Sequence, residues 1–241
     1  MVRKRIDSLL VTRGLAESRA KAQALIMAGE VSVGGEPVTK AGTLVDEAAD
    51  ITVLAPPPFV SRGGIKLEHA LEQFKLDISG KVAADIGAST GGFTDCLLKR
   101  GVQRVYAIDV GYGQLDYRLR QDKRVVVMER INARNPIPLP EKIDIITIDL
   151  SFISVTKVIP SVAELLKDDG FMVVLIKPQF EGKREDVGKG GIIKDPFLHA
   201  KILGRFITWA VGRGYRLKGL VESPILGAEG NREFFVLLKK S

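Results

Sequence analysis

The chain has 241 residues, of which 45% are hydrophobic and 27% charged, and its formal net charge is +7. This balance is typical of a globular protein and excludes a disordered chain, a collagen-like fibre and a coiled coil. The single cysteine excludes an internal disulfide framework. The longest unbroken apolar run, residues 171–176, is far shorter than the roughly 20 residues of a membrane-spanning helix, so we expect no membrane partner. No apolar stretch or cleavage site follows the basic start, so we expect no signal peptide and a cytoplasmic location.

Residues 1–55 predict a small α+β domain. Apolar residues recur at helical spacing from Ile6 to Leu10, and Ser18 is a good N-cap for a second helix. Residues 31–38 predict a hairpin that turns at two glycines, and residues 51–54 predict a last short strand. About 55 residues make a marginal core, so we expect support from the rest of the chain.

Charge is unevenly distributed over this domain. Basic residues dominate its first 21 positions, and acidic residues dominate positions 30–50. The order of its elements resembles the αL RNA-binding module, which is named after a small-subunit ribosomal protein (S-four). The resemblance implies RNA contacts through the basic residues Arg3, Lys4, Arg5, Arg19 and Lys21. Lys and Arg near a helix N-terminus neutralise phosphate and release counterions, whereas the alternative is a solvated helix face.

A proline-rich segment, residues 56–60, predicts a stiff linker to a second domain, residues 61–241. Short β-rich runs alternate there with helical stretches, which predicts a parallel, doubly wound α/β sheet. The predicted strands are 82–86, 104–109, 124–127, 143–149, 171–176, 215–221 and 233–239, and the clearest helices are 93–100, 156–166 and 197–213. Ligands of such sheets bind at the carboxyl ends of the strands.

The first of these strands runs into a glycine-rich loop, DIGASTGGFT, that begins at Asp85. A carboxylate followed by such a loop is typical of nucleotide binding, because glycines let the backbone approach a ligand closely. The next strand ends at Asp109, which is placed to bind ribose hydroxyls. NAD and S-adenosylmethionine both fit this pattern. The spacing of Asp85 and Gly87 favours S-adenosylmethionine, since Ser89 replaces the second glycine of the dinucleotide motif.

Polar residues also follow later strands. Asp149 and Lys177 come directly after two apolar strands, Glu233 stands in the last strand, and Lys66 lies just before the first helix of the domain. Each alone is compatible with a structural role, but together they place two lysines and two carboxylates at the expected mouth of the site.

In this order the four residues match the Lys-Asp-Lys-Glu tetrad of ribose 2′-O-methyltransferases related to FtsJ. The segments SRGGIK (61–66), DIGASTGGFTD (85–95), DLSFIS (149–154) and IKPQFE (176–181) make the whole chain similar to the TlyA, or haemolysin A, family. The resemblance implies a Rossmann-like methyltransferase that uses S-adenosylmethionine to methylate cytidine 2′-hydroxyls in ribosomal RNA of ribosomal subunits. The chain ends soon after Glu233, and short members of the family modify the large subunit, so we expect that substrate.

The resemblance also assigns roles. Lys66, Asp149, Lys177 and Glu233 would be catalytic, with Lys177 as the base or as the cation that steers the developing alkoxide. Its neighbours act on its charge in opposite senses, so both roles stay open. Around the donor, the resemblance implies binding by Asp85, Gly87, Ala88, Gly91, Asp109, Asn132 and Asp149.

Residues 181–191 predict a loop beside the site, in which Lys183, Arg184 and Lys189 either clamp RNA or are merely solvated. Neither histidine has partners at ligand spacing, so we expect no metal site. Three other functions remain open: a haemolysin or pore, a nicotinamide-dependent oxidoreductase, and a non-catalytic RNA-binding or ribosome-assembly factor.

Overall fold

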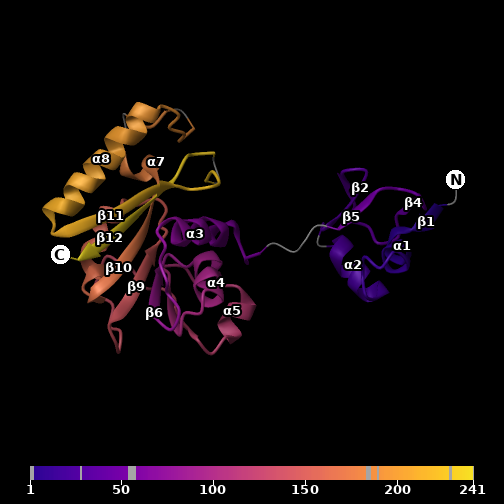
Figure 1. The fold of residues 1–241 in the computed structure, drawn as a ribbon, viewed down its shortest axis with the longest axis horizontal. Helices are drawn as coiled ribbons and strands as arrows, with labels where there is room; N and C mark the ends of the chain where they lie inside the picture. Colours follow the sequence, from indigo (N-terminus) through magenta and orange to yellow (C-terminus); the bar gives the residue numbers. More distant parts are fainter. Residues whose placement is uncertain are drawn as a thin grey trace. The chain divides into compact units, whose positions relative to one another are not determined.

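The computed structural model describes residues 3–27, 29–53, 58–182, 186–188, 190–227 and 230–240. The chain divides into two compact units, Met1–Pro58 and Phe59–Ser241, here called the N-terminal and the C-terminal unit (Figure 1). The division falls within the proline-rich segment. Residues 56 and 57 of that segment, as well as Lys183, Arg184 and Lys189, lie outside the described residues.

The N-terminal unit packs two helices against short strands. Its elements are β1 (Arg3–Arg5), α1 (Ile6–Thr12), α2 (Arg19–Met27), β2 (Val31–Val33), β3 (Glu36–Pro37), β4 (Leu44–Asp46) and β5 (Ile51–Val53). Ser18 caps α2 as predicted, because its Oγ accepts a 3.2 Å hydrogen bond from the Lys21 amide. The predicted hairpin is confirmed as β2 and β3, and β5 pairs with β2.

Strand β1 was not predicted from the sequence, because three consecutive basic residues show no apolar alternation. It pairs with β4 in antiparallel register. This pairing brings the acidic stretch of the unit back onto its basic start. Part of the acidic stretch therefore lies beside the basic start, as the Lys4–Glu47 ion pair shows.

The C-terminal unit is built on a seven-stranded sheet with the order β11-β12-β10-β9-β6-β7-β8. Its strands are β6 (Val82–Ile86), β7 (Arg104–Ile108), β8 (Val125–Met128), β9 (Ile143–Ile148), β10 (Leu166–Ile176), β11 (Tyr215–Glu222) and β12 (Phe234–Lys240). The doubly wound α/β fold is confirmed. Only part of the sheet is parallel, however, because β12 runs antiparallel to both β10 and β11. The chain passes from β11 to β12 without the helical crossover that parallel neighbours need.

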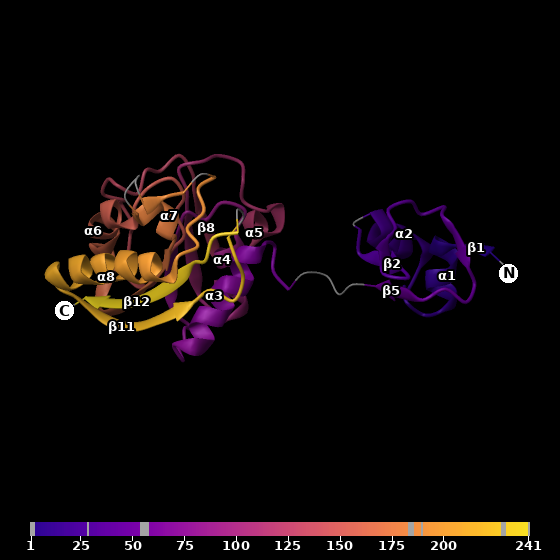
Figure 2. The ribbon, with the colours of Figure 1, turned by 90° about the horizontal axis from the view of Figure 1, so that it is seen from above.

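Helices cover both faces of this sheet (Figure 2). The bounds are α3 (Arg62–Gln73), α4 (Gly92–Lys99), α5 (Tyr117–Gln121), η1 (Val155–Lys157), α6 (Ile159–Ala163), α7 (Pro178–Glu181) and α8 (Pro196–Gly212). Buried residues of α3, α4 and α5 pack on one face, and those of α6 and α8 on the other. The predicted helix 156–166 is too long at its end, because Leu166 already pairs with Ile143 as the start of β10.

Helix α3 differs from the expectation in a way that affects the site. Lys66 lies inside this helix, not before it. The glycines in the first turn of α3 allow close packing. A Cβ on Gly64 would lie 2.2 Å from the ring of Phe59, and one on Gly92 of α4 would lie 2.9 Å from the Gly64 amide nitrogen. The close contact between α3 and α4 presents Lys66 at the edge of the sheet where β6, β9 and β10 end.

Candidate active site

Two adjoining cavities open at the carboxyl ends of the parallel strands, where ligands of such sheets bind. The larger cavity, of about 560 Å³, lies over the ends of β6, β7 and β9. The smaller one, of about 430 Å³, lies between the start of α3 and the residues that follow β6, β9 and β10. Gly87, Ser89 and Asp149 line both. A ligand in the larger cavity can therefore reach a second ligand in the smaller one.

All four predicted catalytic residues line the smaller cavity. They form two ion pairs. The Lys66 ammonium donates a 2.6 Å hydrogen bond to Glu233, and both side chains are nearly buried. The Lys177 ammonium lies 2.6 Å from a carboxylate oxygen of Asp149 and donates a 3.0 Å hydrogen bond to Ser151 Oγ. The fold thus brings together four charged groups that stand far apart in the sequence.

The two pairs differ in their surroundings. Glu233 is 3% exposed, and its second carboxylate oxygen lies so close to Gly227 that a Cβ there would approach it to 2.5 Å. A buried pair of this kind contributes little net stability, but removal of one partner would leave an uncompensated charge. Asp149 is 23% exposed and borders both cavities. The Lys66–Glu233 pair is therefore fixed, whereas the Lys177–Asp149 pair is open to a ligand.

Gly87 sets the distance between the two cavities. Its φ is +86°, a conformation that favours glycine, and a Cβ at this position would lie 2.1 Å from the backbone oxygen of Asp149. Gly87 thus allows a close approach between two loops, whereas its predicted approach to a ligand stays a prediction.

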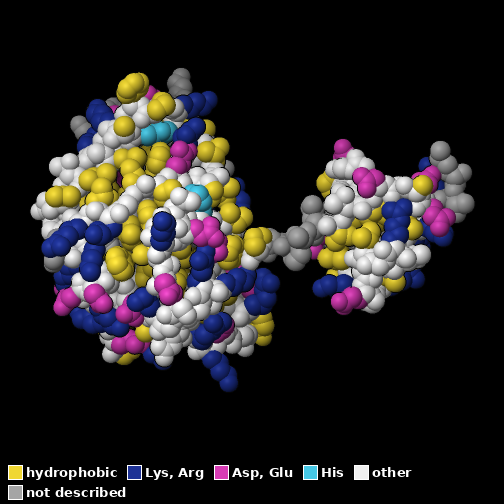
Figure 3. Space-filling model, in the orientation of Figure 1, with side chains coloured by type: hydrophobic (Ala, Val, Ile, Leu, Met, Phe, Trp, Pro, Cys, Tyr) yellow, Lys and Arg dark blue, Asp and Glu magenta, His cyan; other side chains and the backbone are white. Residues whose placement is uncertain are grey.

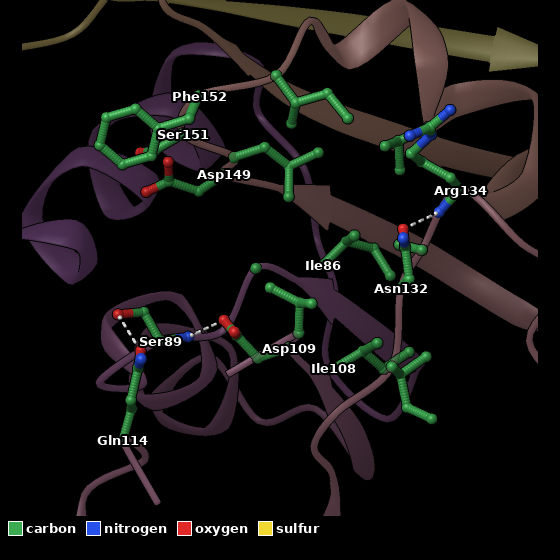
Figure 4. Close-up of a pocket in the computed structure, with 17 residues that line it drawn as sticks. Ile86, Ser89, Ile108, Asp109, Gln114, Asn132, Arg134, Asp149, Ser151 and Phe152 are labelled. Atoms are coloured by element: carbon green, nitrogen blue, oxygen red, sulfur yellow. Dashed lines mark hydrogen bonds between the residues drawn. The ribbon is translucent and has the colours of Figure 1, made fainter. Parts of the chain in front are cut away.

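The larger cavity combines apolar walls with a few polar groups (Figure 4). Asp109 lines it and accepts two backbone hydrogen bonds, at 2.8 Å from the Ser89 amide and 2.6 Å from the Gly111 amide. Asn132 lines it as well, and its Oδ1 accepts a 3.1 Å hydrogen bond from the Arg134 amide. The side chains of Ile86 and Ile108 form part of the apolar wall.

Three residues predicted to bind the donor do not line the larger cavity. Ala88 lines the smaller cavity only, and neither Asp85 nor Gly91 lines either one. Gly91, with φ +95°, is the N-cap of α4, and a Cβ there would lie 2.2 Å from Leu119. The loop needs this glycine for its own packing, and a direct contact of Gly91 or Asp85 with the donor stays a prediction.

Asp85 is fully buried beneath the loop. Its two oxygens accept hydrogen bonds from the hydroxyls of Thr94 at 2.7 Å and Thr147 at 3.0 Å, which tie α4 and β9 to the end of β6. Burial raises the pKa of this carboxyl from 3.8 to about 7, and the threonine hydrogen bonds oppose that shift. Asp85 thus supports the loop from below, and its carboxyl titrates near neutral pH.

Phe152 is a residue that sequence reasoning missed. It lines the larger cavity, is 89% exposed and has φ +65°, which is rare for an aromatic residue. Its ring centroid lies 5.2 Å from that of Phe180. The signal was present in the segment DLSFIS, where a large apolar side chain follows a strand end, but exposure is not visible in a sequence.

Glu181 joins the two loops that carry Asp149 and Lys177. Glu181 was expected to be the first residue of a loop, but it is the last residue of α7. This short helix begins directly after Lys177, which follows β10. Its carboxylate accepts hydrogen bonds from Ser154 Oγ at 2.6 Å and from the Val155 amide at 2.8 Å. Burial raises the pKa of Glu181.

The five basic residues predicted to contact RNA lie in the N-terminal unit. Arg3 and Lys21 are exposed. Lys4 pairs with Glu47 at 2.5 Å, and both Arg5 and Arg19 pair with Asp7. In Figure 3, Lys and Arg side chains lie among Asp and Glu side chains on the viewed face of each unit.

Two further searches concern metals and membranes. Among the described residues, no three His, Cys, Asp or Glu side chains are grouped as metal ligands. Within the same part of the chain, every helix is too short or too polar to cross a membrane.

Comparison with known proteins identifies the family. Residues 59–240 match the family described as FtsJ-like methyltransferase, and residues 4–51 match the S4 domain. The chain belongs to the FtsJ-like methyltransferases. It is 46% identical to "Hemolysin A" of Brachyspira hyodysenteriae over 95% of this chain and 97% of that protein. It is 44% identical to "16S/23S rRNA (cytidine-2′-O)-methyltransferase TlyA" of Mycobacterium tuberculosis, over 98% and 90%.

A solved structure supports the same assignment. A Streptococcus thermophilus protein, provisionally named a hemolysin, is 42% identical and superposes with a TM-score of 0.76 over all of this chain and 90% of that one. The TlyA-like methyltransferase family that the motifs predicted is therefore confirmed, and so is the RNA-binding module of the S4 type at the N-terminus.

The pKa of Asp85 predicts how stability depends on pH. Between about pH 4 and pH 7 the folded protein keeps a proton that the unfolded chain has lost, so stability falls as pH rises, by up to about 1.4 kcal/mol per pH unit. Asp85→Asn lacks this titration. We expect its free energy of unfolding, relative to the wild type, to increase between about pH 5 and about pH 7.5 in denaturant titrations. A difference that does not change with pH would contradict the assignment.

Proposed function

We propose that the protein transfers a methyl group from S-adenosylmethionine to the 2′-hydroxyl of a cytidine in ribosomal RNA, with large-subunit RNA as the substrate. The observation that carries the proposal is the shared wall of the two cavities, where Asp149 borders both and Lys66, Lys177 and Glu233 complete the smaller one. One cavity fits the donor and the other fits the acceptor ribose. We expect an enzyme with this substrate to act in the cytoplasm.

The residues of the larger cavity fit S-adenosylmethionine. Its apolar walls suit an adenine ring, near Asn132, and the Asp109 carboxylate suits the ribose hydroxyls. Gly87 and Ala88, at the boundary with the smaller cavity, suit the methionine part. When bound, the donor supplies a methyl group that is already activated by a sulfonium.

The chain's own residues then act on the acceptor. A hydroxyl oxygen beside Lys177 would bond to the methyl carbon as the carbon–sulfur bond of the donor breaks, and its proton would pass to solvent water. The Lys177 ammonium, which is held by Asp149 and Ser151, would offset the negative charge that develops on the oxygen. The fixed Lys66–Glu233 pair would hold the ribose from the opposite side. Much of the rate would come from orientation of the hydroxyl against the methyl group.

Ribosomal RNA is the substrate that the relatives favour. The Mycobacterium tuberculosis relative is named for 16S and 23S ribosomal RNA, and 23S RNA belongs to the large subunit. The S4 domain adds an RNA-binding module. A non-catalytic RNA-binding factor would not explain why the buried Lys66–Glu233 pair lines a ligand-sized cavity.

The first test measures methyl transfer directly. Labelled S-adenosylmethionine is incubated with unmodified large and small ribosomal subunits, and label is counted in each RNA. We expect label in large-subunit RNA, and Lys177→Ala should reduce it by about a hundredfold because the cation at the acceptor is lost. The control Lys201→Ala, on the exposed face of α8, should retain full activity. Equal label with Lys177→Ala would contradict the assigned role.

Phe152 supplies a second test. An exposed ring at the mouth of the site can stack on the base of the target nucleotide, and such stacking is worth about 1–3 kcal/mol. We expect Phe152→Ala to lower kcat/KM for the subunits by about tenfold or more. Because Phe152 also lines the cavity assigned to the donor, donor affinity is measured by calorimetry, and the loss in kcat/KM for the subunits should exceed any loss in donor affinity. Phe152→Trp should keep most of the activity, and loss of activity with Trp but not with Ala would argue against stacking.

Glu181 supplies a third test, as a positioning residue. Glu181→Ala removes both hydrogen bonds that hold the Asp149 loop to α7, and we expect kcat to fall by about tenfold or more because the Lys177–Asp149 pair loses its alignment. Glu181→Gln can keep both contacts and should restore the rate. The matched control is Asp144→Ala, which removes a carboxylate that also bonds a backbone amide and a side chain but lies at the start of β9. If Asp144→Ala lowers kcat equally, the effect is one of general stability.

A further inference from the structure

One buried carboxylate in the N-terminal unit holds two arginines from different elements. Asp7, in the first turn of α1, accepts hydrogen bonds from Arg5 Nε at 3.1 Å and Arg5 Nη2 at 2.9 Å. It also accepts one from Arg19 Nε at 3.0 Å, and Arg19 is the first residue of α2. Gln23 donates another at 3.0 Å.

The exposure of these groups is unequal. The Asp7 side chain is 0% exposed, whereas those of Arg5 and Arg19 are 46% and 56% exposed. The Arg5 guanidinium, together with Gln23 and Arg19, holds the pKa of the Asp7 carboxyl well below its usual range despite burial. The cluster therefore carries one buried negative charge and two positive charges that face solvent.

The contacts leave part of each guanidinium available. The Arg5–Asp7 contact uses Nε and Nη2, and the Arg19–Asp7 contact uses Nε alone. The remaining nitrogens can donate to an anion, and a guanidinium fork matches the oxygens of a phosphate. An arginine that is already held loses less side-chain entropy when it binds.

We propose that Asp7 is a positioning residue, which holds Arg5 and Arg19 side by side as a preformed site for a phosphate group of the RNA backbone. This inference rests on the proposed function in one respect, namely that the substrate is RNA. It adds a role for an acidic residue in the RNA-binding surface and explains why two of the predicted RNA contacts are ion-paired within the unit.

The direction in which RNA affinity changes when Asp7 is replaced distinguishes a positioning role from an effect of charge alone. If Asp7 acts only through its charge, its removal makes the surface more positive and RNA binding becomes tighter. If Asp7 positions the arginines, its removal frees both side chains and binding becomes weaker. The two accounts therefore predict opposite changes in affinity.

The experiment measures binding of the full-length protein to unmodified large ribosomal subunits over a series of salt concentrations. We expect Asp7→Asn to weaken binding by about tenfold and to make the plot of log K against log salt concentration shallower by about one. The matched control is Glu17→Gln, which removes one negative charge from an exposed position of the same unit. Its affinity should stay equal or increase. Unchanged or tighter binding by Asp7→Asn overturns the proposal.

Circular dichroism of the unfolding transition shows whether Asp7→Asn folds. If it does not fold, a second variant tests the proposal. Arg19→Lys keeps the charge at an exposed position but lacks the fork geometry. We expect about tenfold weaker binding. Wild-type affinity in Arg19→Lys overturns the proposal, as does a wild-type protein that does not bind the subunits.

The methyl-transfer assay separates this proposal from the proposed function. Asp7→Asn should raise KM for the subunits and leave kcat unchanged, because Asp7 is not among the residues that line either cavity. If the wild type binds subunits but transfers no methyl group, the proposed function fails, and the binding titration still decides the role of Asp7.

Discussion

The site depends on the contact between the backbone of Gly87 and the backbone oxygen of Asp149. These residues follow β6 and β9, which are neighbours in the sheet. Because a Cβ at Gly87 would lie 2.1 Å from that oxygen, no other residue allows the two loops to lie so close. This approach puts Asp149 on the wall of both cavities.

Carboxylates hold the loops around this contact in place. Asp109 accepts hydrogen bonds from the backbone amides of Ser89 and Gly111. Asp85 accepts hydrogen bonds from two threonine hydroxyls. Glu181 accepts hydrogen bonds from the Ser154 hydroxyl and from one backbone amide. A carboxylate has only acceptor sites and can satisfy several donors at once. These polar contacts add to the apolar packing of Leu150 and Ile153 against the core of the sheet. Asp7 does the same for two arginines in the N-terminal unit.

The two lysines of the smaller cavity are paired with carboxylates that differ in burial. Lys66 is paired with Glu233 where almost no solvent reaches, and breaking that pair would strand a buried charge. Lys177 is paired with Asp149, which stays partly exposed. In the proposed function, the first pair would be a fixed wall of the cavity, and the second would exchange part of its contacts for a substrate hydroxyl.

The sequence by itself determined the order of the elements, most of their bounds and the family. The strand 82–86 is a short run before a glycine-rich loop, and the Ser18 cap is a local hydrogen bond, so neighbouring residues decide both. The residues of the tetrad were recognisable as a motif, although their roles remain proposals.

The tertiary structure alone decided the depth of Asp85, the exposure of Phe152, the place of Lys66 inside α3 and the direction of β12. Each of these depends on residues that are distant along the chain; the Lys66–Glu233 pair, for example, spans 167 positions. Local propensity carries no information about which distant side chain will cover a carboxylate or leave a ring in solvent. Packing of the sheet and helices settles that, because it removes water from some groups and not from others.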